Sequence, residues 1–251
     1  MKIIPLSEGS FTIDKTKIFI PFNPDEDKIQ SRTVGSLLVE VQPFVVITTK
    51  DILLLDTGLG FSIEGQLQIH KNLIKNGIQP GEVTKVLLSH LHKDHSGGVS
   101  ILDNLGHHSL AFPNATYYFS KDELDYAYEI GFPGYMIDEI SLLNNHEHTF
   151  PLEKSGTIDD YIRFETVGGH CPYHLAFWIR ENDEVVFFGG DVAPQLQQMK
   201  SRFAAKYDFD GKKSMELRQQ WWQQGLAEHW IFLFYHDIKT PSYSNKKNGL
   251  P

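Results

Sequence analysis

Residues 89–95, Ser-His-Leu-His-Lys-Asp-His, hold three histidines and one aspartate directly after an apolar stretch. Such side chains are rarely fully buried unless they are paired or bound to metal, so packing alone does not explain them. Imidazole and carboxylate donors together suit zinc, iron or manganese. At a strand end, His90 and His92 would point to the same side, and the turn that follows would bring Asp94 and His95 back toward them. We interpret this run as a metal site with ligands for two neighbouring ions.

The spacing His-x-His-x-Asp-His at a strand end resembles the signature of the metallo-β-lactamase-fold hydrolases. Four more segments resemble the other motifs of that family and occur in the family's order. They are a strand ending in aspartate and glycine at 52–58, a Gly-Gly-His run at 167–174, a strand ending in Gly-Gly-Asp at 185–191, and a strand ending in His-Asp at 230–237. The resemblance implies the α/β class, with a four-layer αββα sandwich of the metallo-β-lactamase type that forms a single domain over residues 1–251.

The resemblance also implies how the metal ligands divide between two ions. One ion would be held by His90, His92 and His170, the second by Asp94, His95 and His236, and Asp191 would bridge both. The cofactor would be two divalent metal ions, zinc in the first place, with manganese or iron as alternatives. Zinc lowers the pKa of its bound water to about 7, and two ions about 3.5–4 Å apart clamp the attacking and departing oxygens. The implied reaction is hydrolysis by a metal-bridging hydroxide.

Other residues of these motifs receive weaker interpretations. Asp94 either acts catalytically, by orienting the nucleophile or moving its proton, or serves only as a ligand. Asp56 and His174 are expected to support the ligands, because such partners fix the orientation of an imidazole. Cys171 is expected to be a small buried neighbour of a ligand. The other histidines are expected in loops or on the surface; these are His70, His107, His108, His146, His148 and His229.

Local patterns predict the elements that would position these residues. The first three strands, at 36–41, 44–48 and 52–56, would be successive antiparallel strands with short turns. Further strands are predicted at 83–89, 115–120, 163–166, 175–179, 184–188 and 231–234. Helices are predicted over 64–76, where Asn-Gly provides a stop, after a capping box at 120–123, and over 214–228, where only one residue of the Trp221-Trp222 pair need face inward. Two strand-rich halves with intervening helices fit an αββα sandwich.

Substrate choice must come from segments outside the motifs. Residues 19–24, 126–136 and 192–203 are apolar or aromatic enough to line a pocket, and ordinary connector packing is an equal alternative. The overall resemblance is greatest to the lactonase and organophosphate-hydrolase branch. Quorum-signal lactonases usually carry a tyrosine three residues after the bridging aspartate, where this chain has Pro194. Tyr173 and Tyr207 are alternatives that the motif does not specify.

The composition and net charge of the chain limit the classes of molecule that it is expected to bind. The 251 residues include 41% hydrophobic and 22% charged residues, as in a soluble globular enzyme, and the net charge of −9 disfavours nucleic acid. A single cysteine excludes an intramolecular disulfide. The first ten residues lack the apolar core of a signal peptide, and no segment approaches the length of a membrane span. We expect a cytoplasmic protein with a small-molecule substrate, no nucleic-acid or membrane partner, and an oligomeric state that the sequence does not define.

Three functions fit these observations. The leading one is a dinuclear metal-dependent hydrolase of a small ester, lactone or related bond. The second is a phosphodiesterase of the same fold, which the acidic balance and the lack of a basic RNA-binding insertion disfavour. The third is an iron-dependent oxidoreductase, although its flavodiiron relatives have glutamate where this chain has His92 and usually carry a flavin domain. A non-catalytic binding module is disfavoured because all seven ligands are intact.

Overall fold

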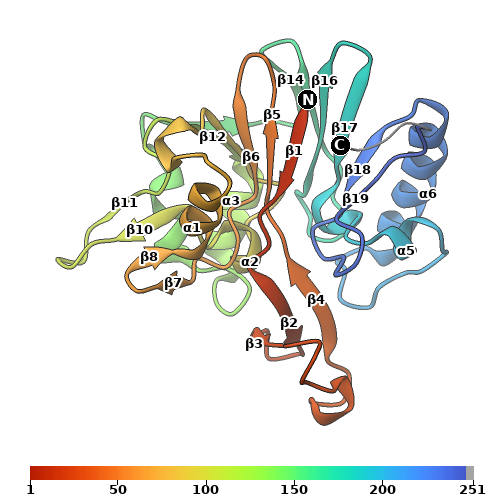
Figure 1. Cartoon of the computed structure of the whole chain (residues 1–251), viewed down its shortest axis with the longest axis horizontal. Coiled ribbons are helices and arrows are strands. Elements are labelled where there is room, and N and C mark those ends of the chain that lie inside the picture. The colour runs from red at the N-terminus through yellow and green to blue at the C-terminus, as the bar shows by residue number, and fades with distance from the viewer. Residues whose placement is uncertain (247–251) are drawn as a thin grey trace. The chain divides into compact units, whose positions relative to one another are not determined.

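The computed structural model describes residues 1–246 and divides the chain into two compact units (Figure 1). The N-terminal unit comprises residues 2–152, and the C-terminal unit comprises Met1 and the residues from Glu153 onward. Each unit contains a six-stranded sheet and its own hydrophobic core, so the predicted α/β class is confirmed. The single domain predicted over residues 1–251 stays a prediction.

The N-terminal unit has strands β1 to β13. Their bounds are β1 Lys2–Pro5, β2 Gly9–Ile13, β3 Ile20–Pro21, β4 Leu37–Val41, β5 Phe44–Ile47, β6 Ile52–Leu55, β7 Ser62–Ile63, β8 Gln66–Leu67, β9 Lys85–Leu87, β10 Ser100–Leu102, β11 His108–Leu110, β12 Thr116–Ser120 and β13 Thr149–Leu152. Its α-helices are α1 Gln68–Lys75, α2 Lys93–Ser96, α3 Lys121–Ile130 and α4 Ile137–Ile140. Short 3-10 helices occupy Ile29–Ser31, Pro80–Glu82 and Ser141–Leu143.

The main sheet of this unit has the order β1-β5-β6-β9-β12-β13. The first three strands pair antiparallel, and β6, β9, β12 and β13 run parallel. Helices α1 and α3 pack on this sheet through an aliphatic cluster that includes Ile69 and Leu73 of α1, Leu124 of α3, and Leu54 and Val86 of the sheet. The predicted strands at 52–56, 83–89 and 115–120 are therefore present, although β9 is shorter than predicted.

Strands β4 and β5 do not form the predicted antiparallel pair. They follow each other along one bent ribbon, in which β4 pairs with β2 and β5 pairs with β1. Between them the Pro43 carbonyl accepts a hydrogen bond from Leu6 N–H at 2.8 Å. Proline has no N–H of its own to donate, so it interrupts the ladder without reversing the chain. Residues 42–43 are thus a bend and not a turn.

Two helix predictions have different outcomes. The predicted helix over 64–76 begins only at Gln68, because residues 62–67 form the small hairpin β7–β8 around Glu64 and Gly65. Both turn residues have positive φ values, 55° and 77°, which helices do not use. After β12, the Ser120 side chain accepts a hydrogen bond from Glu123 N–H, so the predicted N-cap of α3 is confirmed.

The C-terminal unit has a second sheet with the order β14-β15-β16-β17-β18-β19. Its strands are β14 Ser155–Ile158, β15 Ile162–Thr166, β16 Leu175–Glu181, β17 Glu184–Phe188, β18 Ile231–Leu233 and β19 Ser242–Tyr243. Its helices are α5 Leu196–Met199, α6 Gly211–Ala227 and a 3-10 turn at Gly190–Val192. The strands predicted in this half and the helix predicted over 214–228 are confirmed, and α6 begins three residues earlier than predicted.

Aromatic rings fill the core between this sheet and α6. Phe187 lies 4.9 Å from Trp221 and 5.4 Å from Trp230, measured between ring centroids. Trp221 is buried while its neighbour Trp222 is only partly so, as the sequence predicts for adjacent helical residues. None of the helices between residues 1 and 246 has both the length and the apolar character that crossing a bilayer requires.

Candidate metal centre

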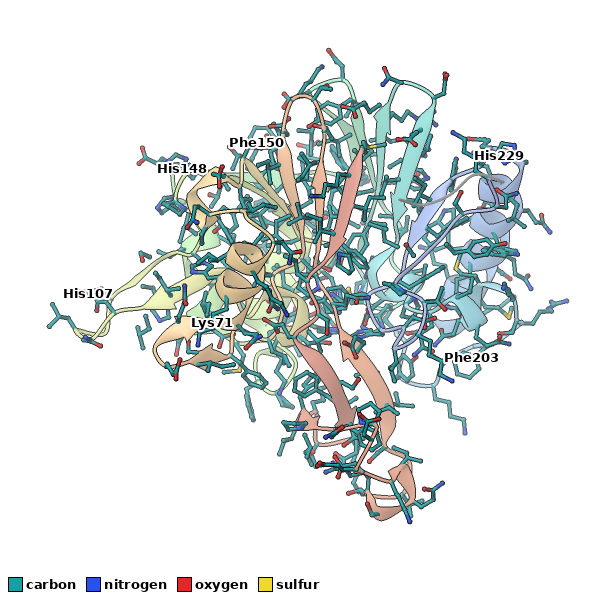
Figure 2. All side chains as sticks on the ribbon, in the orientation of Figure 1. Lys71, His107, His148, Phe150, Phe203 and His229 are labelled. Carbon is teal, nitrogen blue, oxygen red and sulfur yellow. The ribbon has the colours of Figure 1, made fainter. Side chains whose placement is uncertain are left out.

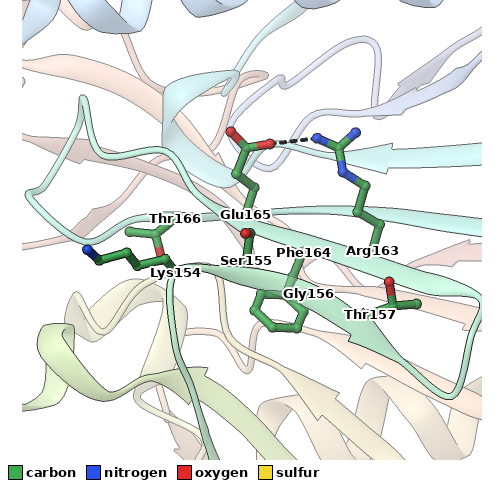
Figure 3. Close-up of a pocket in the computed structure, with 8 residues that line it drawn as sticks. All are labelled: Lys154, Ser155, Gly156, Thr157, Arg163, Phe164, Glu165 and Thr166. Atoms are coloured by element: carbon green, nitrogen blue, oxygen red, sulfur yellow. Dashed lines mark hydrogen bonds and ion pairs between the residues drawn. The ribbon is translucent and has the colours of Figure 1, made fainter.

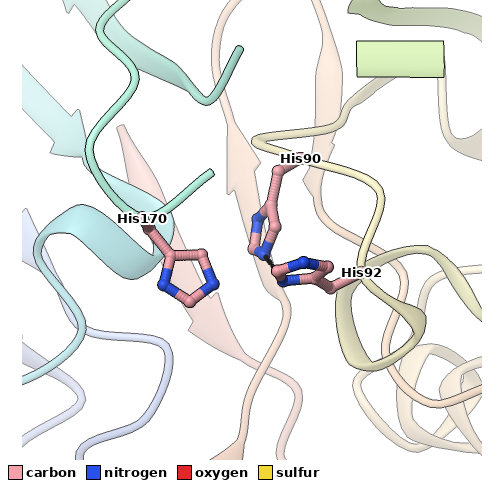
Figure 4. A group of neighbouring side chains, drawn as sticks. All are labelled: His90, His92 and His170. Carbon is pink, nitrogen blue, oxygen red and sulfur yellow. Dashed lines mark hydrogen bonds between the residues drawn. The ribbon is translucent and has the colours of Figure 1, made fainter. Parts of the chain in front are cut away.

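Four predicted ligands of the N-terminal unit lie together just beyond β9. We call His90, His92, Asp94 and His95 the N-terminal cluster. His90 Nε2 lies 3.0 Å from His92 Nδ1, and the two rings are drawn in Figure 4, which also shows His170. The single-turn helix α2 carries Asp94 and His95, and His95 Nε2 lies 3.6 Å from an Asp94 oxygen. The turn after His92 thus returns the second ligand pair toward the first, as the sequence predicts.

The buried carboxylate of Asp56 contacts this cluster through His95 and Ser89. Its carboxylate lies 2.7 Å from His95 Nδ1 and accepts hydrogen bonds of 2.7 Å from both the N–H and the hydroxyl of Ser89. The Ser89 hydroxyl also lies 3.1 Å from His90 Nδ1. Burial raises the pKa of Asp56, and the His95 ring and the Ser89 donors oppose that shift. With Nδ1 of His95 occupied by Asp56, Nε2 is the nitrogen left for a metal. Asp56 thus contacts a predicted ligand, and its role in supporting metal binding stays a prediction.

Glycines let two backbone segments meet behind the cluster. A Cβ atom on Gly98 would overlap the Thr57 carbonyl oxygen, and one on Gly97 would overlap the Leu59 backbone. In return, Thr57 N–H donates a hydrogen bond of 2.7 Å to the His95 carbonyl. The Gly-Gly pair after the ligand run therefore serves close backbone approach.

Three predicted ligands of the C-terminal unit form a second group, the C-terminal cluster. They are His170, beyond β15, Asp191, beyond β17, and His236, beyond β18. One carboxylate oxygen of Asp191 lies 3.4 Å from His170 Nε2, and the other lies 3.1 Å from His236 Nε2. Each oxygen thus faces a different imidazole, an arrangement that is compatible with a carboxylate shared by two ions.

Supporting contacts also surround the C-terminal cluster. Asp208 Oδ1 lies 2.9 Å from His170 Nδ1, and the Asp208 side chain is almost fully buried. Asp191 N–H donates to His174 Nε2 at 3.1 Å, so His174 contacts the backbone of a predicted ligand. The sequence prediction missed Asp208. Its only signal is a place in the polar run Tyr207-Asp208-Phe209-Asp210 just before α6, which resembles an ordinary helix start.

The remaining histidines take no part in either cluster. His107 and His229 are exposed, and Figure 2 labels both of them together with His148. His70 differs from the prediction, because it lies partly buried in α1 with Nε2 2.9 Å from the Ala111 carbonyl oxygen. Burial lowers the pKa of His70. Cys171 is buried beside His170, as predicted.

The loops predicted to line a pocket divide into buried and exposed parts. Tyr135 is buried, and its hydroxyl donates a hydrogen bond of 2.8 Å to the buried carboxylate of Glu123. The Tyr135 ring lies 4.9 Å from the His92 ring, so it packs against a predicted ligand. Phe132, by contrast, is 75% exposed. Within the segment 126–136, Tyr135 therefore packs in the interior, whereas Phe132 is exposed on the surface.

Tyr207 is the better placed of the two alternative tyrosines. Its ring is half exposed and meets the His170 ring edge-on, with 6.2 Å between the centroids. Burial of the hydroxyl region raises the pKa of Tyr207, and the Asp191 charge raises it further. The phenol is therefore protonated at neutral pH and available as a hydrogen-bond donor.

A shallow cavity lies elsewhere in the C-terminal unit, over β14 and β15 (Figure 3). It is lined by residues 154–157 and 163–166, and an ion pair joins Arg163 and Glu165 at 2.6 Å. None of the predicted ligands lies in it. We therefore look to the two histidine and aspartate clusters for the chemistry.

The donor chemistry of both clusters fits divalent metal ions. Every donor is an imidazole nitrogen or a carboxylate oxygen, a set that suits zinc and also manganese or iron. Asp94, Asp191 and His236 are largely buried, and buried groups of this kind are stable when they are paired or metal-bound.

Comparisons with known proteins agree with this geometry. Residues 39–221 match the family model of the metallo-beta-lactamase superfamily. No curated protein sequence matches the chain. Among solved structures, a probable metal-dependent hydrolase from Staphylococcus aureus superposes with a TM-score of 0.77 at 20% identity, covering 99% of this chain and 94% of that one.

Two further structures are similar. The hydrolase AbOPH of the beta-lactamase superfamily gives a TM-score of 0.73 at 21% identity, covering 96% of this chain and 89% of that one. AidC, a dizinc quorum-quenching lactonase solved with its product, gives 0.69 at 20% identity, covering 98% and 91%. At these identities the likeness shows the fold alone.

The family match spans more than half of the chain and includes four of the five motifs. The resemblance inferred from those motifs, and with it the prediction of a metal-dependent hydrolase, is confirmed at the level of the family: this chain belongs to the metallo-beta-lactamase superfamily.

Proposed function

We propose that the protein is a dinuclear metal-dependent hydrolase of small esters, lactones or related bonds. Following the family resemblance, one ion is assigned to His90, His92 and His170, the second to Asp94, His95 and His236, and Asp191 to both. The observation that carries this proposal is the carboxylate of Asp191, whose two oxygens face two different imidazoles at 3.4 and 3.1 Å. In this assignment the two imidazoles belong to different ions, so the carboxylate lies beside a ligand of each ion.

When two divalent ions are bound, they supply an activated water as nucleophile and stabilise negative charge on the substrate oxygens. The chain's own residues prepare the ligands for that task. Asp56 fixes the ring of His95, and Asp208 fixes the ring of His170, each through Nδ1. Both contacts favour the tautomer whose Nε2 is free to bind metal. Asp94 is the residue that we assign to orienting the nucleophile.

The substrate follows from what stands next to the bridging carboxylate. Pro194 offers no hydroxyl three residues after Asp191, so that position cannot protonate a departing alkoxide. Leaving groups that are stable as anions should therefore react faster than those that need a proton. AidC and related solved structures are described with acyl-homoserine products. We expect this protein to prefer activated aryl esters over long-chain acyl lactones.

The test begins with metal analysis of gently purified protein, followed by a panel of aryl ester, lactone, thioester, phosphotriester and cyclic nucleotide substrates. We expect about two equivalents of zinc, manganese or iron per chain and fastest turnover of the aryl ester. A firm value near one equivalent that added metal does not raise would contradict the dinuclear assignment. Turnover confined to cyclic nucleotides or RNA ends would instead establish the phosphodiesterase.

A further inference from the structure

A lysine stands inside the metal-binding run, between two aromatic rings from distant loops. Lys93 Nζ lies 5.9 Å from the ring centroid of Phe19 and 5.9 Å from that of Phe132. Phe19 is held from behind by an edge-on contact with Phe11 at 6.1 Å. These two rings flank the ammonium group next to His92 and Asp94, and Phe132 leaves most of its own surface open.

A second lysine reaches the same place from the turn before β3. The Lys17 ammonium and the His92 ring both lie within 4 Å of the point that a Cβ atom of residue 134 would occupy. Lys93 N–H donates a hydrogen bond of 3.0 Å to the Gly134 carbonyl, which ties this turn to the ligand run. Gly134 therefore lies against the Lys17 ammonium group, the Lys93 backbone and the ring of a predicted metal ligand.

Neither lysine forms a salt bridge with any carboxylate in residues 1–246. The carboxylates whose charges act on Lys93 are Asp94, a predicted ligand, and Glu139, and neither forms an ion pair with it. Lys93 Nζ lies 5.9 Å from the Phe132 ring centroid and Lys17 Nζ lies 3.1 Å from the Cβ position of Gly134, so both ammonium groups face the same short segment and repel each other. An anion bound between them would relieve that repulsion.

We propose that Lys17 and Lys93 form a subsite for an anionic group, a carboxylate or phosphate, on the substrate. The subsite rests on the proposed hydrolase function and narrows its substrate class to esters that carry a negative charge a few bonds from the scissile carbonyl. The rings of Phe19 and Phe132 pack against the apolar linker between the two groups. We assign this subsite to the substrate because it adjoins His92, which belongs to the predicted metal-binding run.

A matched pair of esters tests this. In 4-nitrophenyl adipate a carboxylate replaces the terminal methyl group of 4-nitrophenyl hexanoate, and the leaving group is unchanged. The chain is too long for the carboxylate to attack its own ester readily, and we expect kcat/KM to be higher for the adipate. Lys17→Gln should reduce that preference about threefold and Lys93→Met about tenfold, because Lys93 is less exposed and its charge is less screened. Lys15→Gln, a neutralised lysine on the same turn, should leave the preference unchanged.

Binding provides a second readout that does not need turnover. Calorimetry with the uncleaved 4-nitroanilides of adipate and hexanoate should show tighter binding of the adipyl compound, and Lys17→Gln should reduce this difference in affinity about threefold. Equal kcat/KM for both esters, or a preference that survives both substitutions, would overturn the subsite while leaving ester hydrolysis intact. If neither ester is cleaved, the proposed function fails, and the calorimetry alone still decides whether the lysines bind the anion.

Discussion

The two ligand clusters are built in different ways. The N-terminal cluster lies within six consecutive residues, His90 to His95, and one buried carboxylate, Asp56, supports it through Ser89 and His95. The C-terminal cluster draws its three members from the ends of three strands, spread over residues 170 to 236. Each of its supports acts on one ligand at a time, Asp208 on His170 and His174 on the Asp191 backbone.

The two clusters should therefore respond differently when a supporting residue is lost. A local cluster depends on one turn and one carboxylate, so damage to its support spreads to several ligands. A distributed cluster depends on the packing of the strands and on helix α6, so damage to one support stays with one ligand. The predictions below separate these two behaviours.

The largest effect is expected from Asp191→Ala. Removing a carboxylate that faces two imidazoles should weaken both ions together, whereas Asp94→Ala should weaken only the second. Loss of a supporting residue costs about tenfold to a hundredfold in metal affinity, and loss of a shared ligand should exceed about a hundredfold in affinity and activity. Elemental analysis, hydrolysis rates and circular dichroism would be measured on both variants. Full metal content and near-normal activity in Asp191→Ala would show that the ligand assignment is wrong.

Asp56→Asn and Asp208→Asn compare the two supports directly. At position 56 the new side-chain amide would donate to His95 Nδ1 and force the ring proton onto Nε2, the nitrogen needed for metal. The same substitution at Asp208 would do this to His170. We expect metal affinity to fall about a hundredfold at position 56, where Ser89 and His90 are also affected, and about tenfold at position 208. Competition with a zinc chelator measures both values. Equal losses would remove the distinction between a shared and a single support.

Arg218→Met tests how far the C-terminal cluster depends on α6. The buried guanidinium donates hydrogen bonds to the carbonyls of Val192, at 2.8 Å, and Phe203. Methionine fills similar space but leaves both carbonyls without those donors, so we expect a loss of about 2 kcal/mol in the free energy of unfolding. Urea unfolding measures this, with exposed Arg202→Met as the control, which should change stability by less than about 0.5 kcal/mol. If Arg218→Met also binds less metal than the parent protein, the packing of α6 is needed to position Asp191.

The smallest effect is expected at Glu8, whose carboxylate accepts a 2.7 Å hydrogen bond from Leu59 N–H behind the N-terminal cluster. Burial raises the pKa of Glu8 from 4.5 to about 7, and the Asp94 charge adds to that shift. The unfolded chain therefore ionises before the folded one, so this group makes stability fall as the pH rises from about 4.5 to about 7. In metal-free protein, Glu8→Gln should be more stable than the parent by about 1 kcal/mol at about pH 8 and equal to it at about pH 4.

Urea unfolding at both pH values measures this difference. Glu26→Gln replaces an exposed glutamate in the same half of the chain and should have no effect at either pH. A gain under the acidic condition that matches the gain under the alkaline one would mean that lost charge at Glu8 is not the cause.

The sequence predicts features whose contacts are local in the chain and does not predict those whose contacts are distant. The run from His90 to His95 is visible because its ligands are contiguous, and the cap at Ser120 is visible because its partner is three residues away. Asp208 was missed because its partner, His170, is 38 residues distant and nothing local marks the contact. The pairing of β4 with β2 was missed for a related reason, since only tertiary hydrogen bonds distinguish a bend at Pro43 from a turn.

Position 56 requires both a left-handed backbone and a buried side chain that accepts three contacts, and few residue types satisfy both requirements. Its backbone is left-handed, with a φ of 57°, directly before Thr57 and Gly58, and its side chain must accept three contacts in a fully buried setting. Glycine satisfies the backbone alone, glutamate the charge alone, and asparagine the backbone and the shape but not the proton position on His95. In a saturation library selected for metal binding, position 56 should therefore return aspartate almost exclusively, whereas exposed Lys17 should accept many replacements.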